Sequence, residues 1–155
     1  MSGTFRLLWL IPALPLAGAT INLFLGKRLG RFAGALATAL VAAAFAVSLL
    51  VLGGLLDLAS VDRLVIKHLF EWIHVGTFSV GVDLRLDPLS ATMILVVTGI
   101  GTLIHLYAIG YMRDDPRYGR FFAYLNLFVF FMLMLVLGQN LLVLYLGWEG
   151  VGLCS

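Results

Sequence analysis

The stretch from Phe78 to Tyr111, FSVGVDLRLDPLSATMILVVTGIGTLIHLYAIGY, changes its pattern part of the way along and decides the fold. Up to Leu86, apolar and polar residues alternate, which is the period of a β-strand with one buried face. From Pro88 the residues are almost all apolar, over a length that can cross a bilayer. Asp87 and Pro88 mark the boundary, because Asp caps helix N-termini and Pro suits the first helical position. The stretch therefore predicts an extramembrane strand that leads directly into a transmembrane helix.

The composition of the whole chain indicates a membrane protein. Of its 155 residues, 62% are hydrophobic and 12% are charged, whereas soluble domains carry about 25% charged residues. This number of charges is too small to cover the surface of a soluble globule. We therefore interpret the chain as an all-α polytopic integral membrane protein in a lipid bilayer. The net charge of +2 does not indicate a nucleic-acid partner. The single cysteine, Cys154, excludes an internal disulfide, and no Cys/His spacing typical of a metal site occurs.

Five apolar segments are predicted to be transmembrane helices. Their approximate bounds are residues 7–25, 32–52, 88–110, 121–137 and 140–155. The second is rich in Ala and Gly, which predicts close packing against other helices. The fifth runs for 15 residues from Leu141 to Ser155, about 22 Å of helix. A bilayer core is about 30 Å thick. We therefore expect a truncated fifth helix that ends inside the membrane, in the N-terminal part of a longer antiporter-like helix bundle.

The chain divides into three parts on this interpretation. Residues 1–52 hold helices one and two, and residues 88–155 hold helices three, four and five. Residues 53–87 form an extramembrane loop with a β-hairpin, in which FEWIH pairs with the alternating strand. Asp83 and Arg85 share one face of that strand, and we expect them to stabilise the hairpin together.

Basic residues predict the orientation in the membrane. They gather in two loops, with Lys27, Arg28 and Arg31 in one and Arg113, Arg117 and Arg120 in the other. Because loops rich in Lys and Arg stay cytoplasmic, the N-terminus and the hairpin are expected on the outer face. A signal peptide is the competing interpretation of the first segment, but its basic cluster follows the apolar run instead of preceding it.

Glu149 is the sharpest candidate for chemistry. It lies in LYLGWEGVGLCS, about nine residues into the fifth segment and therefore about 13 Å deep. A charge there costs about 2.5 kcal/mol or more, so such residues mark ion or proton pathways and face a bundle interior by default. The alternatives are a static ion pair between helices and a neutral, hydrogen-bonded glutamic acid. Nearby, Gly147 and Gly150 fall on one helical face together with Cys154, where another helix can approach closely.

His105, in the third segment, is a candidate relay for protons because histidine titrates near neutral pH. The alternative is a neutral core residue that is held by hydrogen bonds. Asn126, in the fourth segment, is expected to bond to another helix.

Several of these stretches resemble a known family. LDPLSATMILVVTGIGTLIHLYAIGYM, RFFAYLNLFVFFMLMLVLGQNLLVLYLGWEGVGLCS and the Trp-containing hairpin are similar to subunit L, or chain 5, of proton-translocating NADH:quinone oxidoreductase, respiratory complex I. The resemblance implies a transporting subunit of the membrane arm, in the bacterial inner membrane, beside other membrane-arm subunits. It implies that Glu149 pairs with a lysine on a later helix and that the hairpin contacts an adjacent antiporter-like subunit. NADH, flavin, iron–sulfur clusters and quinone would be bound elsewhere in the complex, with no cofactor, metal or redox centre in this chain.

Two other functions compete with this one. The large subunit of a multisubunit sodium/proton antiporter is a homologous family with a similar GWE-containing helix, and it would need no NADH. A purely structural membrane scaffold is the second alternative. Glu149 argues against it, because a scaffold gains nothing from the cost of a carboxylate at mid-membrane.

Overall fold

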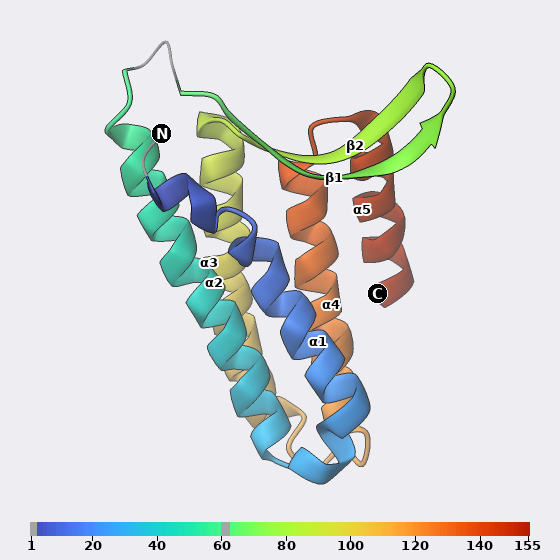
Figure 1. Ribbon diagram of the computed structural model, residues 1–155. Coiled ribbons are helices and arrows are strands. Elements are labelled where there is room, and N and C mark those ends of the chain that lie inside the picture. The colour runs from blue at the N-terminus through green and yellow to red at the C-terminus, as the bar shows by residue number, and fades with distance from the viewer. Residues whose placement is uncertain (1–2, 60–62) are drawn as a thin grey trace.

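The computed structural model describes residues 3–59 and 63–155. A short 3-10 helix, η1 (Gly3–Leu7), leads into α1 (Leu10–Leu29) and α2 (Phe32–Leu56). Two strands, β1 (Val65–Val75) and β2 (Phe78–Leu86), precede α3 (Pro88–Tyr111), α4 (Tyr118–Leu137) and α5 (Leu141–Cys154). Figure 1 shows the helices side by side, with the hairpin lying across one end of them. The expected fold class, a polytopic helical membrane protein with one hairpin, is confirmed.

Among the described residues, four helices are long and apolar enough to cross a membrane. They are Gly3–Leu29 with its 3-10 start, Phe32–Leu56, Pro88–Tyr111 and Tyr118–Leu137, and the fifth, α5, is a shorter apolar helix. α1 packs along α2 and α4, α2 along α3, and α5 along the outer side of α4. Gly26 and Gly119 let α1 and α4 touch backbone to backbone, because a Cβ at Gly26 would lie 3.3 Å from the Gly119 Cα. Small residues therefore allow a close helix contact at this end of the bundle.

α2 buries one face and exposes the other. The buried residues recur at helical spacing and include Ala37, Val41, Ala44 and Ser48, while Leu50 on the opposite side is 59% exposed. The Ala- and Gly-rich sequence predicted a helix packed among others, and that holds for this face only. The helix also continues to Leu56, past the expected end at Leu52, since Leu55 is buried in the core.

α1 likewise runs further than expected. The basic residues Lys27 and Arg28 belong to its last turn instead of a loop. Cations in the last turn of a helix are favourable, because the helix dipole places partial negative charge there. The connection between α1 and α2 is consequently only Gly30 and Arg31, where Gly30 has φ of 53°, a conformation that suits glycine.

The hairpin is longer than FEWIH alone predicts. β1 begins at Val65, pairs with Leu86 and runs antiparallel to β2, with register shifts between His68 and Phe70 and again between Glu71 and Ile73. Alternation along β2 holds where it touches the bundle, because Val82, Leu84 and Leu86 are buried. The alternation of buried and exposed residues is less regular along β1, because each register shift moves the following side chains to the other face.

β2 is fastened to the turn that joins α4 to α5. The Gln139 amide donates to the Asp83 carbonyl at 3.1 Å. The Asn140 side-chain amide donates to the Gly81 carbonyl at 2.8 Å, and Leu84 forms an isolated bridge with Gly138. The hairpin and the first turn of α5 are therefore held as one unit at this end of the molecule.

Candidate functional site

α5 begins at a well-made cap. Asn140 has extended backbone angles, and its side-chain oxygen accepts a hydrogen bond from the Val143 amide at 2.9 Å. This is the geometry in which Asn satisfies an otherwise free amide of the first turn. Because the same side chain also donates to the hairpin, the cap fixes where α5 starts and hence the depth of Glu149 along it.

Two glycines fix the rotation of α5 about its own axis. A Cβ at Gly147 would lie 2.6 Å from the backbone nitrogen of Leu135, and a Cβ at Gly150 would run into the ring of Phe131. Only glycine allows α4 and α5 to approach this closely. The small-residue face predicted from the sequence is confirmed as a helix contact, and its partner is α4.

Glu149 consequently faces away from α4. At about 100° per residue, Glu149 lies about 160° around the helix from Gly147 and about 100° from Gly150, and it is exposed on the structure. Within the described helices the glycines occupy the packed face of α5, so Glu149 does not face α4. Tyr145, one turn earlier, shares its side of α5. Within the described residues no cation forms an ion pair with Glu149.

His105 lies in the bundle interior and is fully buried. Its Nδ1 is 2.7 Å from the Gly101 carbonyl one turn earlier on α3. Its Nε2 is 2.7 Å from the side-chain oxygen of Asn126 on α4. The expected interhelical bond from Asn126 is therefore present, and His105 is its partner. Phe122 lies against the imidazole with a ring-centroid distance of 6.1 Å.

The Asn126 amide decides which form of the imidazole fits this site. With the Asn126 oxygen at Nε2, both ring nitrogens face acceptors, which is the arrangement that a doubly protonated imidazolium requires. With the amide turned over, its nitrogen would donate to Nε2, and a neutral imidazole with hydrogen on Nδ1 would be satisfied. The amide nitrogen is otherwise buried without a partner among the described residues, packed against Gly18 of α1. The protonated and the neutral imidazole would therefore each fit a different orientation of the Asn126 amide.

The structure does not bring the two predicted site residues together. His105 reaches α4 from α3, whereas α5 packs on α4 through Gly147 and Gly150. No hydrogen bond or ion pair among the described residues joins His105 to Glu149. Sequence reasoning also missed Asn22, which is buried in α1 and donates to the Ala33 carbonyl of α2 at 3.1 Å. The available signal was its spacing of four residues from Gly18, which places both on one face of α1.

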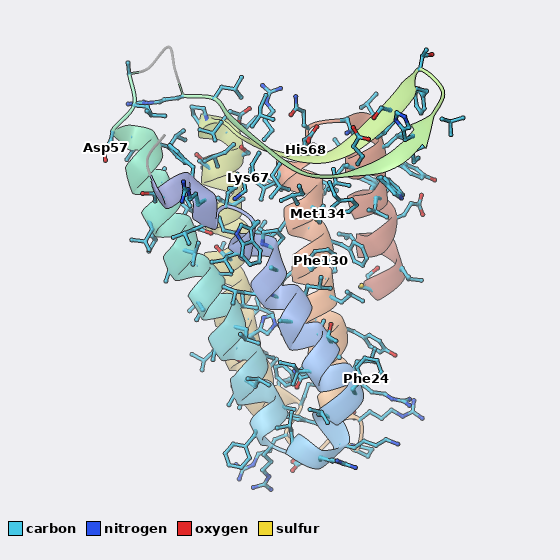
Figure 2. All side chains as sticks on the ribbon, in the orientation of Figure 1. Phe24, Asp57, Lys67, His68, Phe130 and Met134 are labelled. Carbon is cyan, nitrogen blue, oxygen red and sulfur yellow. The ribbon has the colours of Figure 1, made fainter. Side chains whose placement is uncertain are left out.

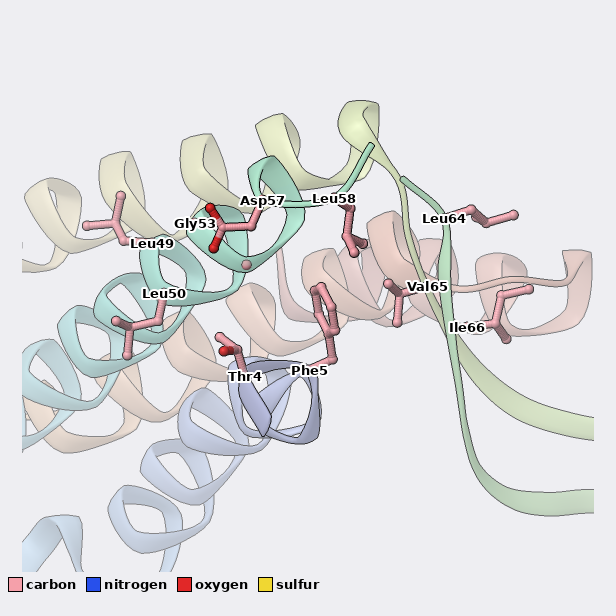
Figure 3. A pocket seen from close by; sticks show the side chains of 11 residues that line it. Thr4, Phe5, Leu49, Leu50, Gly53, Asp57, Leu58, Leu64, Val65 and Ile66 are labelled. Carbon is pink, nitrogen blue, oxygen red and sulfur yellow. The ribbon is translucent and has the colours of Figure 1, made fainter. Parts of the chain in front are cut away.

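Two hollows in the described structure differ in whether a predicted site residue lines them. An apolar groove of about 250 Å³ between α3 and α4 is lined by His105 together with Gly101, Ile104 and Val129. A larger cavity of about 670 Å³ lies where η1, α2 and β1 meet, and Figure 3 shows Phe5, Leu50 and Asp57 around it. Neither is lined by Glu149.

The charges of the hairpin pair differently from the expectation. Asp83 bonds to His68 across the strands, with 2.6 Å between the carboxylate oxygen and Nδ1, and Arg85 lies 3.3 Å from Asp87. The expected pairing of Asp83 with Arg85 is wrong because each finds a nearer partner, Asp83 on the adjacent strand and Arg85 at the cap of α3.

Asp87 caps α3 as the sequence predicts. Its carboxylate accepts from the Ser90 amide at 2.8 Å, and the Ser90 hydroxyl accepts from the Asp87 amide at 2.8 Å. The Ser90 backbone hydrogen bond holds the pKa of Asp87 below its ordinary value of 3.8, with smaller contributions in the same direction from the Ser90 hydroxyl and Arg85. A capping box usually has Glu or Gln at the third helical position, so a search for those residues would overlook Ser90 here.

Comparison with known proteins gives a consistent result. A family model described as NADH-ubiquinone oxidoreductase (complex I), chain 5 N-terminus, matches residues 72–122. NADH-quinone oxidoreductase subunit L of Mycobacterium tuberculosis is 46% identical over 147 residues, which is 95% of this chain and 23% of that protein. Subunit L of Escherichia coli is 60% identical over 89 residues, 57% of this chain and 14% of that protein. The chain thus spans less than a quarter of the length of these relatives.

One solved structure has the same fold. A chain in the structure of the Mrp complex from Dietzia sp. DQ12-45-1b superposes with a TM-score of 0.74 at 27% identity. The match covers 95% of this chain and 15% of that chain.

Proposed function

We propose that this chain translocates protons as a membrane-arm subunit of an NADH-quinone oxidoreductase. The premise is its sequence: it belongs to the family of NADH-quinone oxidoreductase subunit L and chain 5, with similarity over 95% of its length. NADH oxidation and quinone reduction would supply the energy in other subunits, which would also hold the flavin and the iron–sulfur clusters. The observation that carries the proposal is Glu149, a carboxylate in the middle of an apolar helix, in a chain with these relatives.

Glu149 would take up and release the proton. In an apolar environment a carboxylate favours its neutral, protonated form, and a cation brought close favours the ionised form. A cation that approaches and withdraws therefore makes the carboxylate release and bind a proton in turn. The side of α5 that carries Glu149 is free of the described helices, which leaves room for such a cation. The family resemblance implies a lysine on a later helix for this role.

His105 would act as a second proton-carrying group. Its link to Asn126 supports this role, because the same two side chains satisfy either a protonated or a neutral imidazole after rotation of one amide. A fixed core histidine remains the alternative, and the variants described below separate the two.

The hairpin would contact a neighbouring membrane-arm subunit. Its distal half carries exposed apolar side chains, among them Phe70 at 56%, Trp72 at 46% and Phe78 at 57%. Exposed aromatic residues gathered in one place mark interaction surfaces. The basic residues at the other end of the bundle would lie in the cytoplasm of a bacterium, with the hairpin and the N-terminus on the outer face of the inner membrane.

The decisive experiment replaces Glu149 by Gln in the intact complex and assays inside-out membrane vesicles. NADH-driven quinone reduction and acidification of the vesicle lumen are measured together. We expect both to fall while the complex still assembles, because Gln cannot exchange a proton. Asp114→Asn, which also removes a carboxylate but at an exposed position in the loop after α3, is the matched control and should leave both rates intact. Wild-type rates for Glu149→Gln would reduce Glu149 to a structural residue.

The role of His105 is tested with two variants in the same vesicles. His105→Gln keeps a hydrogen-bonding side chain but cannot be protonated, and Asn126→Asp keeps the shape of the partner. A relay predicts that His105→Gln slows acidification and quinone reduction and that Asn126→Asp shifts their pH dependence. A structural histidine predicts normal rates at every pH once the variant complex has assembled.

The sodium/proton antiporter alternative receives less support, since relatives at 46% and 60% identity are named as subunits of NADH-quinone oxidoreductase. It would be favoured over the present proposal if wild-type vesicles exchanged sodium for protons through this subunit without NADH.

A further inference from the structure

A basic cavity lies at the end of the bundle opposite the hairpin. It measures about 730 Å³ and is bounded by the ends of α1 and α4 and by the loops that follow α1 and α3. Five cationic side chains line it: Lys27, Arg31, Arg113, Arg117 and Arg120. Figure 2 shows nitrogen-tipped side chains gathered at this end of the molecule. The proposed proton pathway uses none of them.

The cavity holds little negative charge of its own. Asp115 is the single acidic residue that lines it, and its carboxylate already accepts a hydrogen bond from the Arg117 amide at 2.6 Å. The ion pairs found among the described residues involve only the hairpin and the cap of α3. Cations that share a cavity repel one another, so an anion bound there would be strongly favoured.

One wall of the same cavity is apolar and faces outward. Leu23 is 55% exposed and Phe24 is 77% exposed, and both line the cavity from α1. Figure 2 shows Phe24 on the outer side of this helix. An inorganic anion gains nothing from such a wall. A molecule with an anionic head and a hydrocarbon tail gains from both parts, because the tail lies along the apolar side chains while the head meets the cations.

The inner end of the cavity offers an acceptor. Asn22 lines it and is 1% exposed. Its amide nitrogen is used by the Ala33 carbonyl, while its oxygen is buried without a partner among the described residues. A buried acceptor of this kind calls for a donor such as a hydroxyl or an ordered water. A head group that carries hydroxyls beside its phosphate matches this acceptor as well as the cations.

We propose that this cavity is a binding site for an anionic phospholipid, whose phosphodiester meets the Arg and Lys side chains and whose acyl chains lie along Leu23 and Phe24. The lipid would fill the cavity beside the contact of Gly26 with Gly119, and so brace α1 and α4 at the membrane surface. Basic pockets between transmembrane helices at this depth bind anionic head groups in other membrane proteins. The site goes beyond the proposed proton pathway and would hold in an antiporter or a scaffold equally well.

The test uses the intact complex in vesicles that contain a photoactivatable phosphatidylglycerol with the reactive group near the head. Covalent labelling of this subunit is quantified by mass spectrometry and mapped to peptides. We expect labelling at the ends of α1 and α4, and none above background with photoactivatable phosphatidylcholine. The double variant Arg113→Gln, Arg117→Gln should lower labelling more than tenfold, since each charge contributes about fivefold. The double variant Arg6→Gln, Lys67→Gln, with the same charge change at the other end, should leave it unchanged.

Three results would overturn the proposal. Labelling of the double variant at the wild-type level would show that the arginines do not bind the head group. Equal labelling by phosphatidylcholine would show ordinary annular lipid. Full protection by an excess of inorganic phosphate would identify a free anion as the ligand. Because these readouts require neither NADH nor proton movement, they are independent of the proposed function, and unchanged assembly of both double variants keeps the comparison valid.

Discussion

Replacing Gly147 by Ala tests the contact that orients Glu149. The added methyl carbon would lie 2.6 Å from the Leu135 nitrogen and 2.8 Å from the Leu135 Cα, whereas carbon atoms pack at about 3.5 to 4.0 Å. Its obstacle is the backbone of α4, which cannot rotate away as a side chain could. α5 must therefore move outward by about 1 Å, at an overpacking cost of about 1 to 3 kcal/mol.

Gly152→Ala is the matched control for this change. It lies on the same helix, and a Cβ there meets nothing within 4 Å. Both substitutions gain about 1 kcal/mol of helix propensity, so this contribution cancels when the two variants are compared. The expected difference in stability between them is consequently the overpacking cost alone, about 1 to 3 kcal/mol in favour of Gly152→Ala.

The measurement is a thermal-shift assay on detergent-solubilised membranes, in which the intact subunit that remains soluble is quantified after heating. Gly147→Ala should lower the midpoint temperature relative to Gly152→Ala. It should also slow NADH-driven proton uptake, because Glu149 moves with the helix. Equal midpoints and equal rates for the two variants would refute the close packing of α5 on α4, and with it the orientation assigned to Glu149.

Three further changes give distinct outcomes in the same thermal-shift assay. Asn140→Ala should destabilise the subunit by about 1 to 2 kcal/mol, because it removes the cap of α5 as well as the bond to Gly81; a wild-type midpoint would contradict this. Asp87→Ala should cost about 1 kcal/mol at neutral pH. Since folding lowers the pKa of Asp87, its contribution is complete above the unfolded value of about 3.9 and is lost as the pH falls through the lower folded value. Wild type should therefore lose stability in that acidic range relative to Asp87→Asn, and parallel pH curves would count against the cap. His68→Gln should change stability by less than about 1 kcal/mol, because its pair with Asp83 is largely exposed; a larger drop would mean that the pair is more important than its exposure indicates.

Helix existence and the start of α3 could be predicted from the sequence because local signals decide them. A long apolar run leaves few alternatives to a membrane helix, and Asp87 with Pro88 announces a cap through contacts within four residues. The small-residue face of α5 was predictable for the same reason, since helical geometry alone places Gly147 and Gly150 together.

What the sequence could not supply is the identity of each partner. The direction in which Glu149 faces depends on which helix packs against Gly147 and Gly150. Nothing near Glu149 in the sequence indicates that Leu135 and Phe131 form that contact. The pairing of Asp83 depends on the register of the hairpin, which changes at two places along β1. The bond between His105 and Asn126 joins residues 21 positions apart, so the amide that controls the imidazole appears only once α3 and α4 are packed.

The hydrogen bonds between the hairpin and the α4–α5 turn have a consequence for biogenesis. Gly81 and Asn140, which bond there, are 59 residues apart in the chain. At a synthesis rate of about 5 to 20 residues per second, about 3 to 12 s pass between their appearance at the ribosome. During that interval α3 and α4 must both insert, and the hairpin waits at the membrane surface without its partner. The β2 side chains that later pack on the bundle, Val82 and Leu84 among them, stay uncovered for that time.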